Sequence, residues 1–214
     1  MKLAFMTQRT DSSNTYLEKR DVLDQRWIDF VLQCGLIPVI VPNNYLAASK
    51  LLKHFGDNNH IGGIILTGGG HLSRYGGDAP EREEVEHFLI EYAIITDTPL
   101  LGVCRGMQAI QHFFGQKLIE VDGHVSLQHH VIDNNGYCNY KNSYHHWGTK
   151  ISVQTLVPTF KCIDGVIEAI EHLQYKIKGI MWHPERNYPF DPSDIDLFKR
   201  FLNPQWVERR SDEP

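Results

Sequence analysis

The 214-residue sequence lacks the features of a membrane protein, of a disulfide-stabilised secreted domain and of a nucleic-acid-binding protein. No apolar run approaches the roughly 20 residues that a membrane-spanning helix needs. Lysine and arginine form no stripe and the net charge is −5, which disfavours a nucleic-acid surface. The few cysteines have neither CxxC nor zinc-type spacing and indicate no disulfide framework; they are Cys34, Cys104, Cys138 and Cys162.

Internal repeats, low-complexity segments and a P-loop are also missing. The first residues do not have the pattern of a signal peptide, because their apolar part is only as long as a strand and charge soon follows. We therefore expect a cytoplasmic location. A hydrophobic content of 42% and a charged content of 22% are typical of a globular domain. The length suits one α/β domain, expected over residues 1–205, followed by a charged tail at 206–214.

Histidine is abundant, with twelve residues, and raises the question of a metal. Two adjacent pairs stand out, His129-His130 and His145-His146. Neighbouring side chains of a strand point to opposite faces, so neither pair can supply two ligands by itself. We expect no bound metal and no cofactor.

Strands and helices are predicted to alternate through the first half of the chain, a pattern that favours a mostly parallel sheet with helices on both faces. In such a sheet, ligands bind at the carboxyl ends of the strands. Expected strands are 3–7, 36–41, 61–66 and 99–103, and expected helices are 20–34 (capped by Gly35), 45–55, 81–95 and 107–114.

After residue 115 the pattern changes to short segments, many of them alternating, which predict antiparallel additions to the sheet. These expected strands are 117–121, 128–132, 150–157 and 166–172, with a turn at 133–136. A strand at 177–182 then returns to the parallel part, and a final helix is expected at 192–202, with Asp191 or Ser193 as its cap.

The segment from Pro99 to Gln108 has the layout of a nucleophile elbow, a sharp turn between a buried strand and a helix. Gly102 and Gly106 flank Cys104 where the backbones must approach too closely for a Cβ. Cys104 would then lie at a helix N-terminus, which favours an anionic thiolate. The alternative is a small cysteine packed in a glycine-rich turn.

A base for such a nucleophile is present near the C-terminus. His183 and Glu185 are separated by Pro184, which ends a strand because it cannot continue the ladder. In an extended chain residues i and i+2 point the same way, so the carboxylate can orient the imidazole. A surface His-Pro-Glu turn is the alternative.

A third element is the buried strand 61–66, which is followed by Gly68-Gly69-Gly70. Glycines at a strand end let backbone N–H groups approach a reacting carbonyl, as an oxyanion hole requires. The N–H groups of Gly69 and Arg105 are the expected donors. Taken alone, such a run is also compatible with a flexible loop.

These three motifs, in this order, resemble class I glutamine amidotransferases. Residues 142–146 (Asn-Ser-Tyr-His-His), together with 7–9 and 18–21, resemble the stand-alone γ-glutamyl hydrolase branch, the peptidase C26-like enzymes. The resemblance extends from about Lys2 to Leu202. Many ammonia-producing members carry Leu and His where this chain has Arg105 and Met107, whereas Arg-Gly-Met-Gln is more usual in the hydrolases.

The resemblance implies catalytic roles for Cys104, His183 and Glu185 through a γ-glutamyl thioester. It implies an oxyanion hole at Gly69 and Arg105. It also implies that the glutamyl group is bound by Gly70, Gln108, His145 and His146. Without the family pattern, the two histidines are equally compatible with a polar loop or strand edge.

The loop at 71–81 follows the oxyanion strand and can reach the site. Arg74 and Tyr75 could meet the leaving group or a phosphate on it, in which case the loop acts as a lid. A solvated connection is the alternative.

The leading hypothesis is hydrolysis of a small-molecule γ-glutamyl amide to glutamate and an amine or amidate. Members of this branch remove γ-glutamyl protecting groups, and the resemblance implies γ-glutamyl-γ-aminobutyrate or the γ-glutamyl-CDP-amidate of capsule biosynthesis as candidates. Two alternatives stay open: a glutaminase subunit that delivers ammonia to a synthetase partner, and a non-catalytic cysteine sensor or binding protein. A homodimer is left open, and no nucleic-acid or membrane partner is expected.

Overall fold

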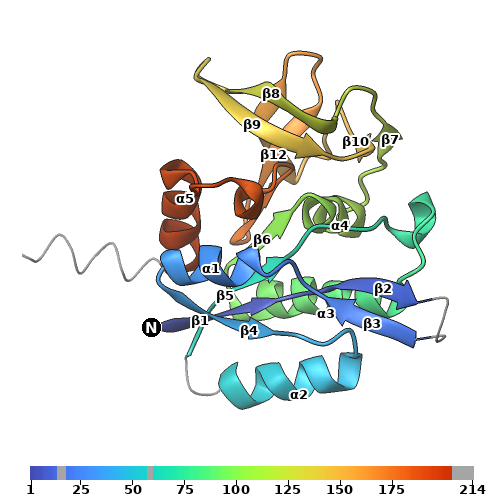
Figure 1. Ribbon diagram of the computed structural model, residues 1–214, viewed down its shortest axis with the longest axis vertical. Helices are drawn as coiled ribbons and strands as arrows, with labels where there is room; N and C mark the ends of the chain where they lie inside the picture. The colour runs from blue at the N-terminus through green and yellow to red at the C-terminus, as the bar shows by residue number, and fades with distance from the viewer. Residues whose placement is uncertain (14–17, 57–59, 204–214) are drawn as a thin grey trace, which may run out of the picture.

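The computed structural model describes residues 1–13, 18–56 and 60–203, and a nine-stranded sheet runs through this part of the chain (Figure 1). The strand order is β4-β1-β5-β6-β13-β12-β11-β8-β9. Five strands are parallel: β4 (Leu36–Ile40), β1 (Lys2–Met6), β5 (Ile61–Leu66), β6 (Leu100–Val103) and β13 (Ile177–Ile180). The α/β class predicted from the sequence is confirmed.

Helices cover the parallel strands on both faces and bury two apolar layers. Residues of α2 (Tyr45–Gly56), α3 (Pro80–Thr96) and α4 (Arg105–Phe113) pack into one layer, with Leu52, Leu89 and Met107 fully buried. Residues of α1 (Arg26–Gln33) and α5 (Pro192–Leu202) pack into the other layer. Asp191 caps α5 by accepting a hydrogen bond from the Ser193 N–H, as the sequence predicted.

The remaining strands of the large sheet are antiparallel and come from the C-terminal half. They are β12 (Ile167–His172), β11 (Leu156–Cys162), β8 (Val125–Asp133) and β9 (Cys138–Tyr144). A separate two-stranded ladder joins β7 (Ile119–Glu120) to β10 (Trp147–Gly148). In Figure 1 these strands stand above the helix-covered part of the molecule.

The helix expected at 20–34 is too long at its start. Residues 18–22 form β3 (Glu18–Val22), which pairs with β2 (Arg9–Ser13) in a hairpin, and α1 begins only at Arg26. The strand is polar and exposed, so no hydrophobic alternation reveals it. Long-range contacts hold it in place, because Asp21 accepts hydrogen bonds from the backbone and side-chain amides of Asn43.

Two further expectations for the C-terminal half are wrong. Residues 150–155 form turns, and the strand begins at Leu156. The Asn142 motif lies on β9, a strand that the sequence did not predict because its exposed face is polar. The short β7 pairs with β10 outside the large sheet.

Among the described helices, none is both long and apolar enough to cross a membrane. The charged tail predicted at 206–214 lies outside the described residues.

Candidate active site

Cys104 lies directly after β6, in the turn that leads into α4. Its backbone has φ 51° and ψ −106°, a conformation that L-residues rarely adopt and that costs on the order of 1–3 kcal/mol. A Cβ on Gly102 would lie 2.5 Å from the Gly106 carbonyl carbon, and a Cβ on Gly106 would overlap the Leu66 carbonyl. The two glycines therefore permit the sharp turn, as the sequence predicted, and the side chain of Cys104 projects from it.

His183 and Glu185 lie just beyond β13, the strand beside β6. The imidazole Nδ1 and the Glu185 Oε1 are 2.6 Å apart, and both side chains are only 2% exposed. The other side of the imidazole is hydrogen-bonded to Cys104. Parallel pairing of β6 and β13 places residues 79 positions apart at the same sheet edge, with Ile180 opposite Val103. The structure thus joins thiol, imidazole and carboxylate in a row.

The backbone of His183 is held by a side chain from the antiparallel half. Asn142 on β9 donates from Nδ2 to the His183 carbonyl and accepts at Oδ1 from the His183 N–H, each at 2.8 Å. Asn142 is 4% exposed, so water does not compete well for these bonds. The imidazole is thus fixed by Glu185 and its backbone by Asn142.

The glycine run after β5 forms the opposite wall. A Cβ on Gly68 would overlap Cε1 of the His183 imidazole, so only glycine fits there. Gly69 and Gly70 have φ values of 90° and 75°, in the region that favours glycine. Thr67 anchors the run to the end of β1, because its N–H and hydroxyl bond to Thr7 at 3.0 and 2.9 Å.

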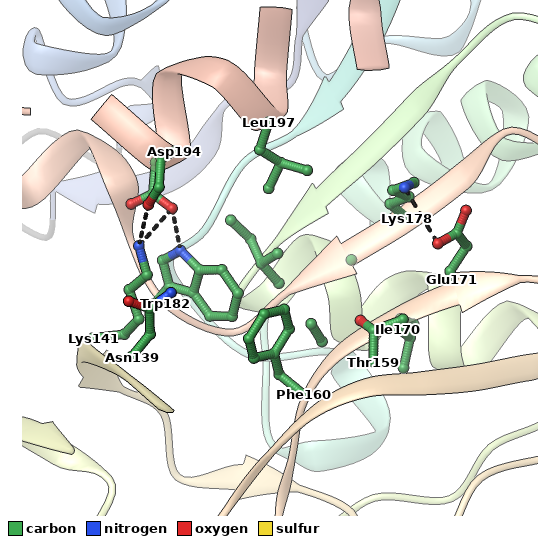
Figure 2. A pocket seen from close by; sticks show the side chains of 14 residues that line it. Asn139, Lys141, Thr159, Phe160, Ile170, Glu171, Lys178, Trp182, Asp194 and Leu197 are labelled. Atoms are coloured by element: carbon green, nitrogen blue, oxygen red, sulfur yellow. Dashed lines mark hydrogen bonds and ion pairs between the residues drawn. The ribbon is translucent and has the colours of Figure 1, made fainter. Parts of the chain in front are cut away.

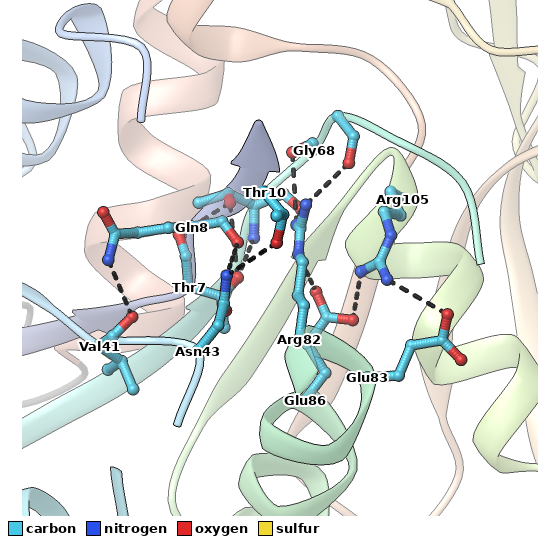
Figure 3. A network of polar contacts seen from close by, with 12 residues as sticks. Thr7, Gln8, Thr10, Val41, Asn43, Gly68, Arg82, Glu83, Glu86 and Arg105 are labelled. Carbon is cyan, nitrogen blue, oxygen red and sulfur yellow. Dashed lines mark hydrogen bonds and ion pairs between the residues drawn. The ribbon is translucent and has the colours of Figure 1, made fainter. Parts of the chain in front are cut away.

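A buried arginine holds this glycine run from behind (Figure 3). The Arg82 guanidinium on α3 donates to the carbonyls of Thr67 (2.6 Å), Gly69 (2.8 Å) and Gly68 (3.3 Å). It also pairs with Glu86 at 2.7 Å, one helical turn away. With its carbonyls turned toward Arg82, the run can present N–H groups on its other side. Burial lowers the Arg82 pKa to about 10, although Glu86 opposes the shift.

The side chain of Arg105 belongs to the same network. Its guanidinium pairs with Glu86, and its Nε donates to the His71 carbonyl at 3.3 Å. At 1% exposure it is as buried as Arg82 and Glu86. The side chain thus anchors the first residue of α4, which leaves the backbone N–H of Arg105 as the part that can face a substrate at the helix N-terminus.

The family assignment rests on comparison with known proteins. The model of the family "Glutamine amidotransferase class-I" matches residues 22–202. The chain belongs to the class I glutamine amidotransferases. The elbow, the glycine run and the His-Pro-Glu motif all lie within the matched range.

Named relatives fall on two sides of this family. The chain is 31% identical to a γ-glutamyl-CDP-amidate hydrolase of Campylobacter jejuni, over 92% of this chain and 96% of that one. It is 25% identical to a γ-glutamyl-γ-aminobutyrate hydrolase of Escherichia coli O157:H7, over 84% and 85%. It is 28% identical to the glutamine-hydrolysing subunit of a GMP synthase from Methanococcus vannielii, over 72% and 80%.

Solved structures of the amidotransferase type share the fold. A glutamine amidotransferase from Thermotoga maritima superposes with a TM-score of 0.62 at 14% identity, covering 100% of this chain and 87% of that one. At that identity the likeness concerns the fold alone.

Other residues expected at the substrate are placed less directly in this amidotransferase. Gln108 is buried on α4, and its Nε2 donates to the Trp147 carbonyl at 2.8 Å. His145 is also buried, with Nδ1 at 3.1 Å from the same carbonyl. His146 is exposed, 6.0 Å from the His71 ring. Gln108 and His145 are thus both engaged within the protein, and their contact with substrate stays a prediction.

The loop at 71–81 contains a short 3-10 helix, η1 (Ser73–Tyr75). Arg74 is exposed, as its predicted role requires. The Tyr75 ring packs against Trp147 with centroids 4.7 Å apart, and its hydroxyl accepts a hydrogen bond from the Leu118 N–H. Tyr75 therefore anchors the loop, and its role toward the leaving group stays a prediction.

A cavity of about 330 Å³ lies between α5 and β11–β13, and Cys104, His183 and Glu185 do not line it (Figure 2). At its edge, Asp194 accepts hydrogen bonds from Lys141 Nζ (2.8 Å) and from the Trp182 indole (2.9 Å). Trp182 directly precedes His183, so this network restrains the chain at the base. The cavity itself contributes apolar packing.

Sequence reasoning missed Arg82, Glu86 and Asn142 as parts of the site. Arg82 and Glu86 are spaced i, i+4 on a helix, which usually indicates an exposed ion pair. The available signal was their position on the same face as the apolar Val85 and Leu89, which are also buried.

Glu86→Ala should destabilise the fold strongly. It would leave the guanidiniums of Arg82 and Arg105 buried without their shared carboxylate, a change that costs about 3–5 kcal/mol in comparable buried pairs. Urea unfolding would measure the loss. The control is Glu91→Ala on the exposed side of α3, which should change stability by less than about 0.5 kcal/mol. Equal stabilities for both variants would contradict a structural role for the network.

Proposed function

We propose that this chain hydrolyses a γ-glutamyl amide through a thioester on Cys104. The observation that carries the proposal is the row of Cys104, His183 and Glu185 beside a glycine run whose carbonyls are turned away toward Arg82. Such a row is the arrangement of an activated nucleophile, and the N–H groups of the run and of Arg105 are suited to stabilise an oxyanion.

In the first step the Cys104 thiolate attacks the γ-carbonyl carbon, and the carbonyl oxygen becomes an oxyanion. The N–H groups of Gly69 and Arg105 would donate to it. As the intermediate collapses, the C–N bond breaks and the His183 imidazolium gives its proton to the leaving nitrogen. The products are the free amine or amidate and a γ-glutamyl thioester.

In the second step His183, now neutral, takes a proton from water as the water attacks the thioester. The C–S bond breaks, glutamate leaves and the thiolate–imidazolium pair is restored. Glu185 holds the imidazole in one orientation through both steps. Asn142 keeps its backbone in place and acts as a positioning residue.

For the leaving group we propose a nucleoside diphosphate amidate, in line with the substrate in the name of the Campylobacter jejuni relative. A narrow pocket beside the triad brings Arg9 and Arg186 together with Gly68, Gly69 and His183. Arg9 is exposed, and Arg186 lies 4.3 Å from the Tyr144 ring, so both can reach a diphosphate. This substrate would place the enzyme in capsule phosphoramidate biosynthesis.

The deciding experiment measures glutamate release from γ-glutamyl-CDP-amidate, γ-glutamyl-γ-aminobutyrate, γ-glutamyl peptides and glutamine. Fast, Cys104-dependent release from the nucleotide amidate, with glutamine a poor substrate, would support the full proposal. Preference for another conjugate would overturn the leaving group and retain the chemistry. Release from glutamine alone would favour an ammonia-delivering subunit like the GMP synthase relatives. A reactive Cys104 without turnover of any compound would favour a sensor.

Gly68→Ala should lower kcat by about 100-fold, because the new methyl group would displace the imidazole of His183 and a misplacement of about 1 Å has effects of this size. Steady-state kinetics with the best γ-glutamyl substrate would measure it. Gly56→Ala is the control: its Cβ would meet only the far end of the Tyr92 side chain, which can turn aside. Unchanged kcat in Gly68→Ala would mean that His183 does not take part at this position.

The pH profile of kcat/KM should fall on its alkaline side. Burial alone would lower the His183 pKa, but the Cys104 thiolate and the Glu185 carboxylate outweigh it and raise the pKa to about 9. The imidazolium that protonates the leaving group is therefore present below about pH 9 and is lost above it. In Glu185→Gln one stabilising charge is removed, so the fall should begin at lower pH. The surface variant Glu171→Gln should keep the wild-type profile.

A further inference from the structure

A second group of ionisable side chains is buried in the antiparallel half of the sheet. We call His124, His129, His145 and Glu168 the histidine–glutamate cluster. His124 Nδ1 and His145 Nε2 each lie 3.3 Å from Glu168 Oε1, and His129 Nε2 lies 3.6 Å from Oε2. Glu168 is on β12, His129 is on β8, and the other two directly precede β8 and follow β9.

The outer nitrogen of each imidazole is next to a second partner. His145 Nδ1 is 3.1 Å from the Trp147 carbonyl, and His124 Nε2 is 3.3 Å from the Asp164 carboxylate. A carbonyl and a carboxylate only accept hydrogen bonds, so each ring must carry its proton on that outer nitrogen. In the neutral tautomers, the inner nitrogens of His124 and His145 therefore direct lone pairs at the Glu168 carboxylate.

Two lone pairs facing an anionic oxygen repel one another unless a cation lies between them. Water is largely excluded, because Glu168 is fully buried and His124 and His145 are each 2% exposed. Within the described residues, the inner nitrogens of the three histidines and both Glu168 oxygens have no hydrogen-bond partner of acceptable geometry. The separations are too long and misdirected for hydrogen bonds, yet the atoms converge.

We propose that these groups bind a zinc ion, with His124 Nδ1, His145 Nε2 and Glu168 Oε1 as its protein ligands. These three atoms lie within 4.8 Å of one another. Two ligands about 2.0–2.1 Å from a tetrahedral zinc are about 3.3–3.4 Å apart, which matches the two separations of 3.3 Å between a histidine nitrogen and Glu168. Two imidazoles and a carboxylate are a common zinc donor set.

The surroundings supply what a metal site of this kind needs. Metal-bound histidines usually donate their other N–H to a carboxylate or a carbonyl, as His124 does to Asp164 and His145 to Trp147. His129 faces the second oxygen of Glu168, and its Nδ1 is 3.4 Å from Cys162 Sγ. With one zinc, the charges of Glu168 and Asp164 would be balanced.

The expectation of no metal rested on the two adjacent histidine pairs, each of which points to opposite faces. The exposure pattern agrees, since His145 is buried while its neighbour His146 is exposed. Pairing of β8 with β9 and the return of β12 bring His129 from one pair to the side of His145 from the other. A ligand set assembled across strands has no spacing motif.

The proposed ion is structural and supports the active site from behind. The Trp147 carbonyl that accepts from His145 also accepts from Gln108 on the nucleophile helix. The Glu168 carbonyl accepts from the Met181 N–H at 2.8 Å, two residues before His183. Zinc would therefore tie β8, β9 and β12 together where Asn142 and His183 are held.

Metal analysis of the full chain tests the proposal. Protein produced in zinc-supplemented medium and dialysed should retain about one zinc per chain by plasma mass spectrometry. Removal with a chelator should lower the melting temperature, and added zinc should restore it. Less than about a tenth of a zinc per chain, with no thermal shift on adding zinc, would overturn the proposal and leave a buried histidine–glutamate ion-pair network. Stoichiometric iron, manganese or nickel in its place would overturn the choice of zinc.

Variants locate the ion. Glu168→Gln and His145→Ala should lose the bound zinc and the stabilisation by added zinc. The matched controls are His146→Ala and His130→Ala, which change the exposed neighbours in the two histidine pairs and should keep one zinc per chain. Equal zinc content in Glu168→Gln and the controls would place any metal elsewhere.

X-ray absorption on the wild-type protein needs no variant to fold. The zinc edge should report only nitrogen and oxygen neighbours at about 2.0–2.1 Å. A sulfur neighbour at about 2.3 Å would assign the ion to the neighbouring set of His124, His129 and Cys162 and would contradict the ligands named here.

Discussion

Cys104→Ala should abolish hydrolysis of every γ-glutamyl compound that the wild-type protein accepts. The substitution removes the only atom that can form the thioester, and loss of a nucleophile that works with a base lowers kcat on the order of a million-fold. The variant should fold, because alanine fits where Cys104 is 6% exposed and the strained backbone is set by its neighbours. Glutamate release and circular dichroism would be measured on the same preparation.

Cys138→Ala is the matched control. Cys138 is an exposed cysteine on β9, and its thiol lies 3.2 Å from His130, so a reactive surface thiol could in principle mislead labelling experiments. This variant should retain full turnover. Normal hydrolysis by Cys104→Ala would remove the proposed mechanism altogether. A stability loss without an activity loss would return Cys104 to the structural role considered from the sequence.

His183→Ala is expected to lower kcat almost as far. Without the imidazole, no group holds the thiolate in its charged pair, protonates the leaving nitrogen or activates water. The effect should lie in kcat, because the glutamyl group would still be held by the rest of the site. Single-turnover measurements would separate loss of thioester formation from loss of its hydrolysis.

The double variant Cys104→Ala/His183→Ala provides the sharper test. Nucleophile and base act as one unit, so removing both should cost little more than removing either. Multiplicative losses would mean that the two residues act independently, contrary to the row seen in the structure. His172→Ala, which changes another buried histidine, should leave kcat close to wild type and so controls for the loss of an imidazole.

The parallel half of the fold and the three glycine-bearing or proline-bearing motifs were predictable because their determinants are local. Gly102 and Gly106 are required by a turn between two adjacent elements, and the strands at 61–66 and 177–180 are short apolar runs ended by Gly68 or Pro184. Parallel strands share one carboxyl edge, so these motifs were expected to meet. The hairpin β2–β3 and strand β9 were missed because their side chains are polar and only pairing partners define them.

Asn142, Arg82 and the histidine–glutamate cluster show the limit from the other side. Each is a polar side chain whose partner is a backbone group or a residue far along the chain. Asn142 is 41 positions from His183, and Glu168 is more than 20 positions from each histidine around it. Burial changes the meaning of such residues, since an i, i+4 ion pair on a surface and one that holds the glycine run have the same sequence pattern.

The sequence by itself determined where the nucleophile turn lies, which residues flank it and which histidine and carboxylate stand ready at a neighbouring strand end. Steric demands of glycine and proline act within a few residues, so they can be read without the fold. Only the tertiary structure decided that Arg82 turns the glycine run toward the site, that Asn142 holds the base and that three histidines surround one glutamate. Those contacts depend on strand order and on burial in a medium where unpaired polar groups are costly, and neither is encoded in any short stretch of the chain.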